Sequence, residues 1–412
     1  RHPQSCFRAL AEFGTHKSRR RWWKYTKTFP SSHSCQRSTP YKKNFMSSIV
    51  RKLLFPLPDP PDYNETTFPE DLIWVPQDEK KKKPLIPCIF LPYKGAKRMV
   101  IYCHGNGCDL GTIYEELLRY REYWQVHILA MEYPGYGLCS GEPDEKSIND
   151  AVFNVYGYIT KQLRWPSLFI FFYGRSIGTG PVCKLVSALQ AQGTRVGGII
   201  LHCAYTSIRD VVSNAIGSVA AALITDRWQN IKEVESIDCP ILLIHGQADK
   251  LIPFTHSEIL YDKCKSQHKQ LVIVAEATHN TFNEVEDIKK PIEKFIKRAA
   301  LLMQKTLKHY ADARKKKTTR NKQKKLSRRN SSAEDSGSRK DEVLDSPKRS
   351  QRNMNRNPEK SNILIQESRH LEKNSSKNIH KKELHKQGEE KSAPRDTSRN
   401  SFTCRSSSFF VK

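Results

Sequence analysis

The chain has 412 residues, of which 37% are hydrophobic and 27% are charged, and its formal net charge is +27. So few core-forming residues exclude a single compact body that uses the whole length. The positive charge lies at the two ends, because residues 1–45 hold 11 Lys and Arg against 1 Asp or Glu, and residues 304–412 hold 30 against 13. Residues 46–303 carry 29 residues of each sign. The composition therefore predicts one neutral domain between two basic ends.

We expect a basic, disordered leader over residues 1–45, a folded domain over 46–305 and a disordered basic tail over 306–412. Met46 opens an apolar, Pro-rich segment, and either it is the natural first residue or the leader precedes it. The tail is too polar to offset its conformational entropy by burial. Its run from Lys315 to Arg329 has the charge to bind phosphates of a nucleic acid or an anionic membrane surface, or to serve as a nuclear import signal, but such runs are more often solvated disorder.

The apolar stretches are shorter than the roughly 18 residues that a membrane-spanning helix needs. The N-terminus has no apolar signal-peptide core. The 11 cysteines are scattered and mostly lie within apolar runs, which is typical of reduced thiols rather than of a disulfide framework. We therefore expect a cytoplasmic protein without a transmembrane segment. Residues 49–57 have two interpretations, peripheral membrane contact or packing against their own domain.

Short apolar runs alternate with longer amphipathic ones between residues 64 and 303, which is the pattern of parallel strands joined by helices. The predicted strands are Met99–Cys103, His127–Glu132, Leu168–Tyr173, Gly197–Cys203, Pro240–His245 and Gln270–Ala275. The predicted helices include Ser147–Leu163, with Ser147 as its N-cap, Ile177–Gln192 and Lys290–Lys305. Because the strands are apolar on both faces, helices must cover both sides. We expect a doubly wound, mostly parallel α/β sheet.

Ser176 is the central residue of a G-x-S-x-G motif that follows one predicted strand and precedes a predicted helix. A nucleophile on so sharp a turn needs small residues two positions to either side, here Gly174 and Gly178, because neighbouring elements approach closely. Its hydroxyl then lies at a helix N-terminus, which favours developing negative charge. The motif predicts a nucleophilic serine, with a glycine-rich turn and a surface serine as the alternative.

Asp249 and His279 each follow the end of a later predicted strand. The order Ser176, Asp249, His279 is that of the α/β-hydrolase arrangement, so we expect the three side chains at one edge of the sheet. There His279 would take the Ser176 proton, and Asp249 would fix the tautomer of the imidazole. The other acids and histidines that we considered, with structural or surface roles favoured, are Asp226, Asp238, Asp262, His202, His245 and His256.

His104, Gly105, Asn106 and Gly107 form a glycine-rich loop after the first core strand. Acyl transfer needs two backbone N–H donors for its oxyanion, and we predict that Asn106 and Ile177 supply them. A turn without a ligand is the alternative. The sequence contains no zinc-type cysteine spacing, H-E-x-x-H, phosphate-binding loop or dinucleotide fingerprint. We therefore expect no cofactor and no metal.

Over roughly residues 65–300 these features resemble the α/β-hydrolase superfamily, and more narrowly the bud-emergence-type serine hydrolases and the α/β-hydrolase-domain protein depalmitoylases, with a serine aminopeptidase-like hydrolase domain. The likeness lies in HGNGCDLG, EYPGYGLCSGEP, YGRSIGTGP, TDRWQNIKEVESIDCPILLIHGQADKLIP and THN. It implies the same triad and a small cap between Thr206 and Glu235. Two features depart from the family: Thr281 replaces the usual acid after His-Asn, and no cysteine cluster follows Met46.

The resemblance and the motifs together predict a serine hydrolase that cleaves an acyl ester or thioester through an acyl-enzyme. Its substrate would be an acylated small molecule or an acylated protein, with protein S-palmitoyl thioesters as one candidate. The alternative is a catalytically inert hydrolase fold that serves as a binding module tethered by its basic tail. The sequence leaves open the acyl chain, the leaving group and the oligomeric state.

Overall fold

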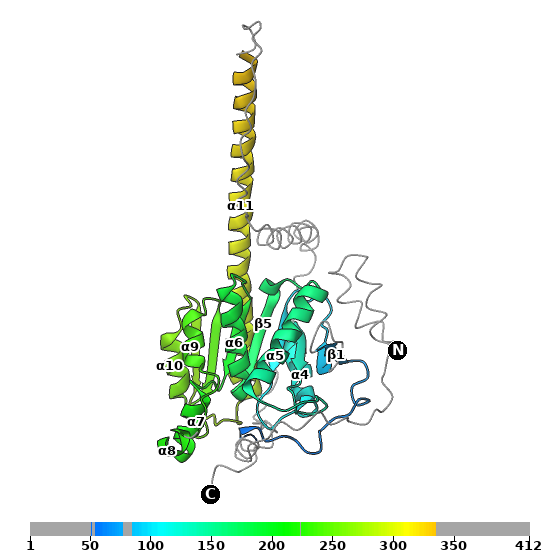
Figure 1. Ribbon diagram of the computed structural model, residues 1–412, viewed down its shortest axis with the longest axis vertical. Helices are drawn as coiled ribbons and strands as arrows, with labels where there is room; N and C mark the ends of the chain where they lie inside the picture. Colours follow the sequence, from blue (N-terminus) through cyan, green and yellow to red (C-terminus); the bar gives the residue numbers. More distant parts are fainter. Residues whose placement is uncertain (1–50, 52–53, 77–84, 223, 335–412) are drawn as a thin grey trace, which may run out of the picture. The chain divides into compact units, whose positions relative to one another are not determined.

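A computed structural model describes residues 51, 54–76, 85–222 and 224–334 of the chain (Figure 1). The described residues form an eight-stranded sheet with the order β1-β2-β4-β3-β5-β6-β7-β8. Its strands are β1 (Leu72–Pro76), β2 (Leu85–Leu91), β3 (Met99–Cys103), β4 (His127–Met131), β5 (Ile170–Arg175), β6 (Gly198–His202), β7 (Ile241–Gly246) and β8 (Lys269–Val274). Strands β3 to β8 pair in parallel, while β2 pairs antiparallel with both β1 and β4. The predicted mostly parallel sheet is confirmed.

The six predicted strands are all present, with ends that differ by at most two residues. Their continuous apolar sequences are explained by burial, because every residue of β3 to β7 is buried. The sequence analysis did not predict β1 and β2. Strand β2 contains Pro87, and a proline within an apolar run usually argues against a strand.

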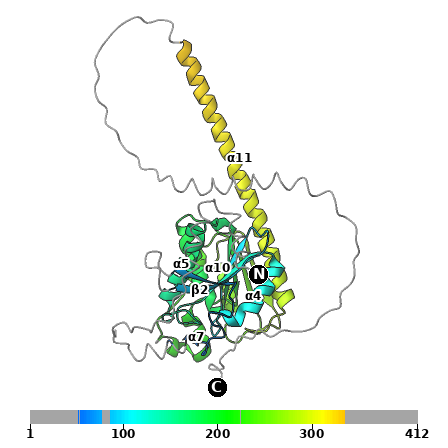
Figure 2. The ribbon, with the colours of Figure 1, turned by 90° about the vertical axis from the view of Figure 1, so that its right-hand side faces the viewer.

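Helices cover both faces of the sheet, as the doubly wound prediction requires (Figure 2). The helices are α4 (Leu110–Trp124), α5 (Glu145–Gly157), α6 (Thr179–Ala191), α7 (Ile208–Ile216), α8 (Ser218–Ala222), α9 (Asn230–Glu233), α10 (Thr255–Lys263) and α11 (Lys290–Glu334). Buried residues of α5, α6 and α10 join one hydrophobic core, and those of α4 and the first turns of α11 join the other. Helices α7, α8 and α9 lie between β6 and β7 and form the small cap.

Helix α5 begins before the predicted N-cap, so the assignment of that role to Ser147 is corrected. The N-cap is Asp144, whose carboxylate accepts the N–H of Ser147, while the Ser147 hydroxyl accepts the N–H of Asp144. This reciprocal pair is a capping box, in which the serine stands three residues inside the cap. The aspartate carboxylate accepts one of the free N–H groups of the first turn, and the helix therefore begins at Glu145.

Helix α11 continues to Glu334, so the structure describes residues 306–334, the first part of the expected tail, as helical. Lys, Arg, Gln, Leu and Ala are strong helix formers, so a composition too polar for a core can still form a helix. The chain divides into two compact units, and the second begins at Ala300 within α11. The leader over residues 1–45 and the tail beyond Glu334 lie outside the described residues. None of the helices that the structure describes is long and apolar enough to cross a bilayer.

Candidate active site

Ser176 lies on a sharp turn between β5 and α6. Its φ of +50° falls in the left-handed region, which costs a residue with a Cβ about 1–2 kcal/mol. A Cβ atom at Gly174 would lie 2.6 Å from the carbonyl oxygen of Gly178, and one at Gly178 would overlap the carbonyl group of Cys103. The two glycines therefore let β5, α6 and the end of β3 approach closely enough to hold the strained serine.

The structure brings together the three side chains that the sequence analysis selected. Nε2 of His279 lies 3.0 Å from Oγ of Ser176, and Nδ1 of His279 lies 2.7 Å from Oδ2 of Asp249. The three residues follow the ends of β5, β7 and β8. They lie close together because the carboxyl ends of parallel strands meet at one edge of a sheet. Such a chain of hydrogen bonds can move a proton from the hydroxyl to the imidazole.

Asp249 is held as a buried carboxylate. Its Oδ1 accepts the backbone N–H groups of Leu251 and Ile252, both at 2.9 Å, and its Oδ2 also lies 3.3 Å from Nε2 of His245. Burial alone would raise the pKa of Asp249, but hydrogen bonds from His245 and His279 lower it well below its ordinary value. Asp249 is therefore ionised at neutral pH.

His245 was interpreted as a structural histidine, and the structure places it directly behind the acid. Its Nδ1 lies 2.6 Å from Oγ of Ser257, and its Nε2 lies 2.8 Å from the carbonyl oxygen of Ile252. Since the carbonyl and the Asp249 carboxylate can only accept, Nε2 carries the proton. The only feature of the sequence that could have indicated this contact is the position of His245 near the end of β7, four residues before Asp249.

The base has the protonation behaviour that proton abstraction needs. Burial lowers the pKa of His279, and its hydrogen bond to Asp249 offsets this effect only in part. The ring is therefore neutral at pH 7, with Nδ1 donating to Asp249 and Nε2 able to accept.

Thr281 stands at the position where the resemblance leads us to expect an acid. Its hydroxyl accepts the N–H of Thr278 and lies 2.7 Å from the Thr278 hydroxyl.

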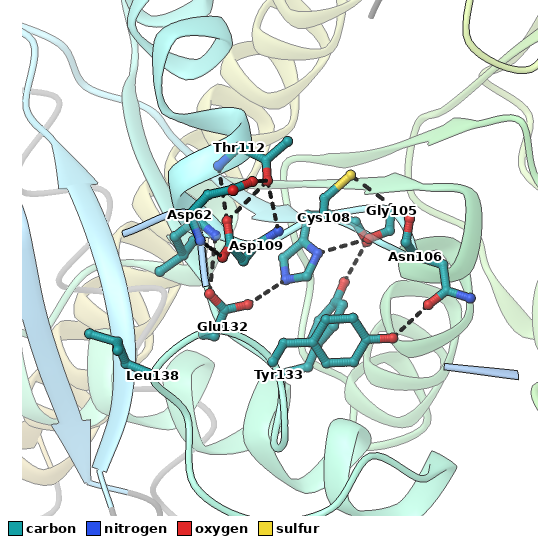
Figure 3. Close-up of polar contacts among 12 residues, drawn as sticks. Asp62, Gly105, Asn106, Cys108, Asp109, Thr112, Glu132, Tyr133 and Leu138 are labelled. Carbon is teal, nitrogen blue, oxygen red and sulfur yellow. Dashed lines mark hydrogen bonds and ion pairs between the residues drawn. The ribbon is translucent and has the colours of Figure 1, made fainter. Parts of the chain in front are cut away.

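The loop after β3 lies beside the serine, because a Cβ atom at Gly105 would lie 3.9 Å from Cβ of Ser176. Figure 3 shows hydrogen bonds that hold this loop. Nδ2 of Asn106 donates to the carbonyl oxygen of Leu54 at 2.7 Å, and its Oδ1 accepts from the Tyr136 hydroxyl at 2.6 Å. The Tyr133 hydroxyl donates to the carbonyl oxygen of His104 at 2.9 Å. Asn106 and Ile177, which directly follows the serine, thus stand on the two segments expected to bind an oxyanion, and that role stays a prediction.

A buried network under this loop was missed by the sequence analysis (Figure 3). Oε1 of Glu132 lies 3.0 Å from Nε2 of His104, and its Oε2 accepts from the Tyr63 hydroxyl and the Leu110 N–H, both at 3.0 Å. A Cβ atom at Gly137 would overlap this carboxylate. The network joins the loop to β4 and α4. Its sequence signals were the histidine of HGNG and the glutamate of EYPGYG.

One group of side chains in the described residues has metal-ligand chemistry. Ligand atoms of Cys203, Asp249 and His279 lie within 4.8 Å of one another. However, burial and the nearby Asp249 charge raise the pKa of the Cys203 thiol, whereas a metal needs the thiolate. Asp249 and His279 are already bonded to each other at 2.7 Å. These residues therefore fit a proton-transfer site better than a metal site.

The parallel sheet, the inserted cap and the strained serine turn define the α/β-hydrolase fold. Residues 224–286, which include Asp249 and His279, match the family model "Serine aminopeptidase, S33". The chain is 26% identical over 255 residues to the α/β-hydrolase domain-containing protein aho-3 of Caenorhabditis elegans, covering 57% of this chain and 74% of that protein. It is 27% identical over 220 residues to α/β-hydrolase domain-containing protein 17B of Homo sapiens, covering 53% of this chain and 73% of that protein.

A solved structure of an α/β-hydrolase from Vibrio vulnificus aligns with a TM-score of 0.49 and 13% identity, over 64% of this chain and 98% of that chain. The resemblance to the α/β-hydrolase superfamily is confirmed by the sequence relatives and by the fold.

Proposed function

We propose that this chain is a serine hydrolase that cleaves an acyl ester or thioester through a covalent acyl-enzyme. The observation that supports it most strongly is the unbroken chain of hydrogen bonds from Ser176 through His279 to Asp249. Oγ of Ser176 attacks the acyl carbon while Nε2 of His279 takes the hydroxyl proton. Asp249 holds the other ring nitrogen and stabilises the imidazolium that forms.

The reaction proceeds through a tetrahedral intermediate. Its oxyanion accepts hydrogen bonds from the backbone N–H groups of Asn106 and Ile177. Removing one such donor typically costs about 10²- to 10³-fold in rate. Collapse of the intermediate breaks the bond to the leaving alcohol or thiol, which receives its proton from His279. Water then attacks the acyl-enzyme with His279 as the base, which releases the acid and restores the Ser176 hydroxyl.

Protein S-palmitoyl thioesters are the substrate class that the resemblance to protein depalmitoylases favours. Cleavage of a small acyl ester uses the same site, so the chemistry of the triad does not choose between the two. A series of acyl chains of increasing length, each offered as an ester and as a thioester, separates these substrates by their kcat/KM values. A preference for long-chain thioesters would support a protein depalmitoylase, and a preference for short esters would favour a small-molecule esterase.

A fluorophosphonate probe tests the reaction class, because it reacts covalently with an activated serine. We expect labelling of the wild type, no labelling of Ser176→Ala, and normal labelling of Ser236→Ala, which removes a serine hydroxyl bonded to Ser187 in another part of the domain. Equal labelling of the wild type and Ser176→Ala would contradict the proposal. Absence of labelling in a folded wild type would favour the inert binding module.

We also propose that the basic part of the chain binds an anionic surface. Residues 315–329 hold nine Lys or Arg and no Asp or Glu, and they are helical within α11. Phosphate groups of lipids or of nucleic acids attract such a run. Seven of the described cysteines are free and buried, whereas Cys108 is disulfide-bonded, which departs from the expectation of reduced thiols throughout, so the cysteines do not favour one redox compartment.

A further inference from the structure

Arg175 is the variable residue before the serine of the G-x-S-x-G motif, and the chemistry proposed above assigns it no part. It is the last residue of β5, and only 5% of its surface is exposed. Its Nη2 donates to the carbonyl oxygen of His279 at 3.1 Å and to Oδ1 of Asn280 at 2.8 Å. One buried arginine therefore joins the segment of the nucleophile to the segment of the base.

The same guanidinium group reaches the loop after β3. A Cβ atom at Gly105 would lie 2.9 Å from Nη1 of Arg175, so the glycine leaves the room that the arginine needs. The Arg175 side chain thus lies against two segments that come from β3 and β8, while its own backbone continues into Ser176. These are the three segments whose mutual positions the proposed reaction depends on.

Arg175 interacts electrostatically with a buried acid, Glu116 of α4. Burial raises the pKa of Glu116, and the charge of Arg175 opposes that rise. Oε1 of Glu116 accepts a hydrogen bond from the Tyr102 hydroxyl at 3.3 Å. A buried charge persists only when it is paired and hydrogen-bonded. Arginine suits the position because its planar group offers several donors in a fixed arrangement, which a lysine ammonium does not.

The loop of His279 needs such a contact. Its buried ends are Ala277 and Phe282, and the intervening residues are polar. The hydroxyl of the exposed Thr281 accepts the N–H of Thr278 and bonds the Thr278 hydroxyl, which closes the turn within the loop. Arg175 supplies the charged connection between the loop and the strand that carries Ser176.

We propose that Arg175 is a positioning residue, which holds the backbone of His279 so that its imidazole stays within hydrogen-bond reach of Ser176. The inference rests on the proposed serine hydrolase and adds a determinant of its rate. A misplacement of about 1 Å in a reacting group can cost on the order of 10²-fold. Because Arg175 is buried, we expect its loss to lower kcat and to change KM little.

The test compares Arg175→Ala with wild type in the full chain, with an acyl ester as substrate and thermal unfolding as the check on folding. We expect kcat to fall on the order of 10²-fold while KM stays within about threefold of its wild-type value. Guanidinium chloride at millimolar concentration should restore part of kcat, and urea, which has a similar shape without the charge, should not. Arg121→Ala, which removes an arginine paired with Glu122, should keep its kcat and gain nothing from guanidinium.

Wild-type kcat in a folded Arg175→Ala, or a loss that guanidinium does not reverse, would overturn the inference. If that variant fails to fold, Arg175→Lys decides, because the lysine keeps the charge but cannot donate to both acceptors in the same geometry. We expect Arg175→Lys to lose about tenfold in kcat, and wild-type kcat would again overturn the inference. Failure of the proposed function is distinct, because the wild type itself would then neither react with the fluorophosphonate probe nor hydrolyse any ester.

Discussion

The carboxylate of Glu132 lies 3.0 Å from Nε2 of His104, and neither side chain has any exposed surface. Nδ1 of His104 lies 2.9 Å from the carbonyl oxygen of Gly105, so the ring connects the glutamate to the loop beside Ser176. Two further groups, the Tyr63 hydroxyl and the Leu110 N–H, donate hydrogen bonds to Oε2 of Glu132. The pair therefore fixes the loop through contacts that are fully buried in the domain.

Loss of this glutamate should destabilise the fold more than loss of one of its donors. Glu132→Ala leaves the buried His104, the Tyr63 hydroxyl and the Leu110 N–H without their shared partner, and each unsatisfied buried group costs about 1–3 kcal/mol. Tyr63→Phe removes one hydrogen bond and should cost about 1 kcal/mol. Urea unfolding followed by circular dichroism measures both. Equal free energies of unfolding for the two variants would show that the pair does not hold the loop.

The rate of hydrolysis should rise with pH through the titration of His279. The ring must be neutral to accept the Ser176 proton, and burial lowers the pKa of His279 below its ordinary value. We therefore expect kcat/KM to reach half of its plateau below pH ~6.5. A pH profile of ester hydrolysis measures this, and a half-maximum clearly above that pH would contradict the environment described for His279.

Asp249→Asn should change that profile in a defined direction. The charge of Asp249 raises the pKa of His279, so its removal should move the half-maximum to lower pH. The plateau should also fall by on the order of 10⁴-fold, since the ring loses its correct tautomer. Asp238→Asn, a change at an exposed acid after the cap, should leave both unchanged. A large loss in the Asp238 variant instead would reassign the acid.

Two glycine substitutions test the turn that carries Ser176. Gly178→Ala places a methyl group against the carbonyl group of Cys103, so either the turn moves or the domain unfolds. We expect fluorophosphonate labelling to be lost and the Tm to fall. Gly157→Ala, near the end of α5, meets nothing within 4 Å and should keep full labelling, with a gain of up to about 1 kcal/mol in helix stability. Normal labelling of Gly178→Ala would contradict the close approach.

Much of the fold could be predicted from the sequence because its strands are buried on both faces. Strand β3 has the predicted bounds of Met99–Cys103, and a continuous apolar run needs no tertiary information to be recognised. Strand β2 was not predicted, because Pro87 interrupts its pattern and its partners are antiparallel. Likewise, Asp144 and Ser147 form one capping box, and the sequence does not show which of two capping residues begins the helix.

The candidate site divides in the same way. Ser176, Asp249 and His279 each follow a recognisable strand, so spacing and chain order could find them. The positions of Arg175 and His245 relative to the triad could not be predicted, because they depend on side chains that meet only after the sheet has formed. Arg175 contacts residues more than 100 positions away, and local patterns carry no information about such contacts.

The basic run over residues 315–329 should bind anionic surfaces by charge alone. Each Lys or Arg near a membrane that contains phosphatidylserine contributes about 1 kcal/mol, and rising salt screens the attraction. Replacing the nine basic residues by Gln keeps a strong helix former at each position, so it removes the charge without favouring an unfolded tail. We expect the wild type, but not this variant, to sediment with phosphatidylserine vesicles at low salt, with equal ester hydrolysis by both proteins. Tighter binding to duplex DNA with a steep salt dependence would identify nucleic acid as the partner, and salt-independent binding of either ligand would contradict a charge-based tether.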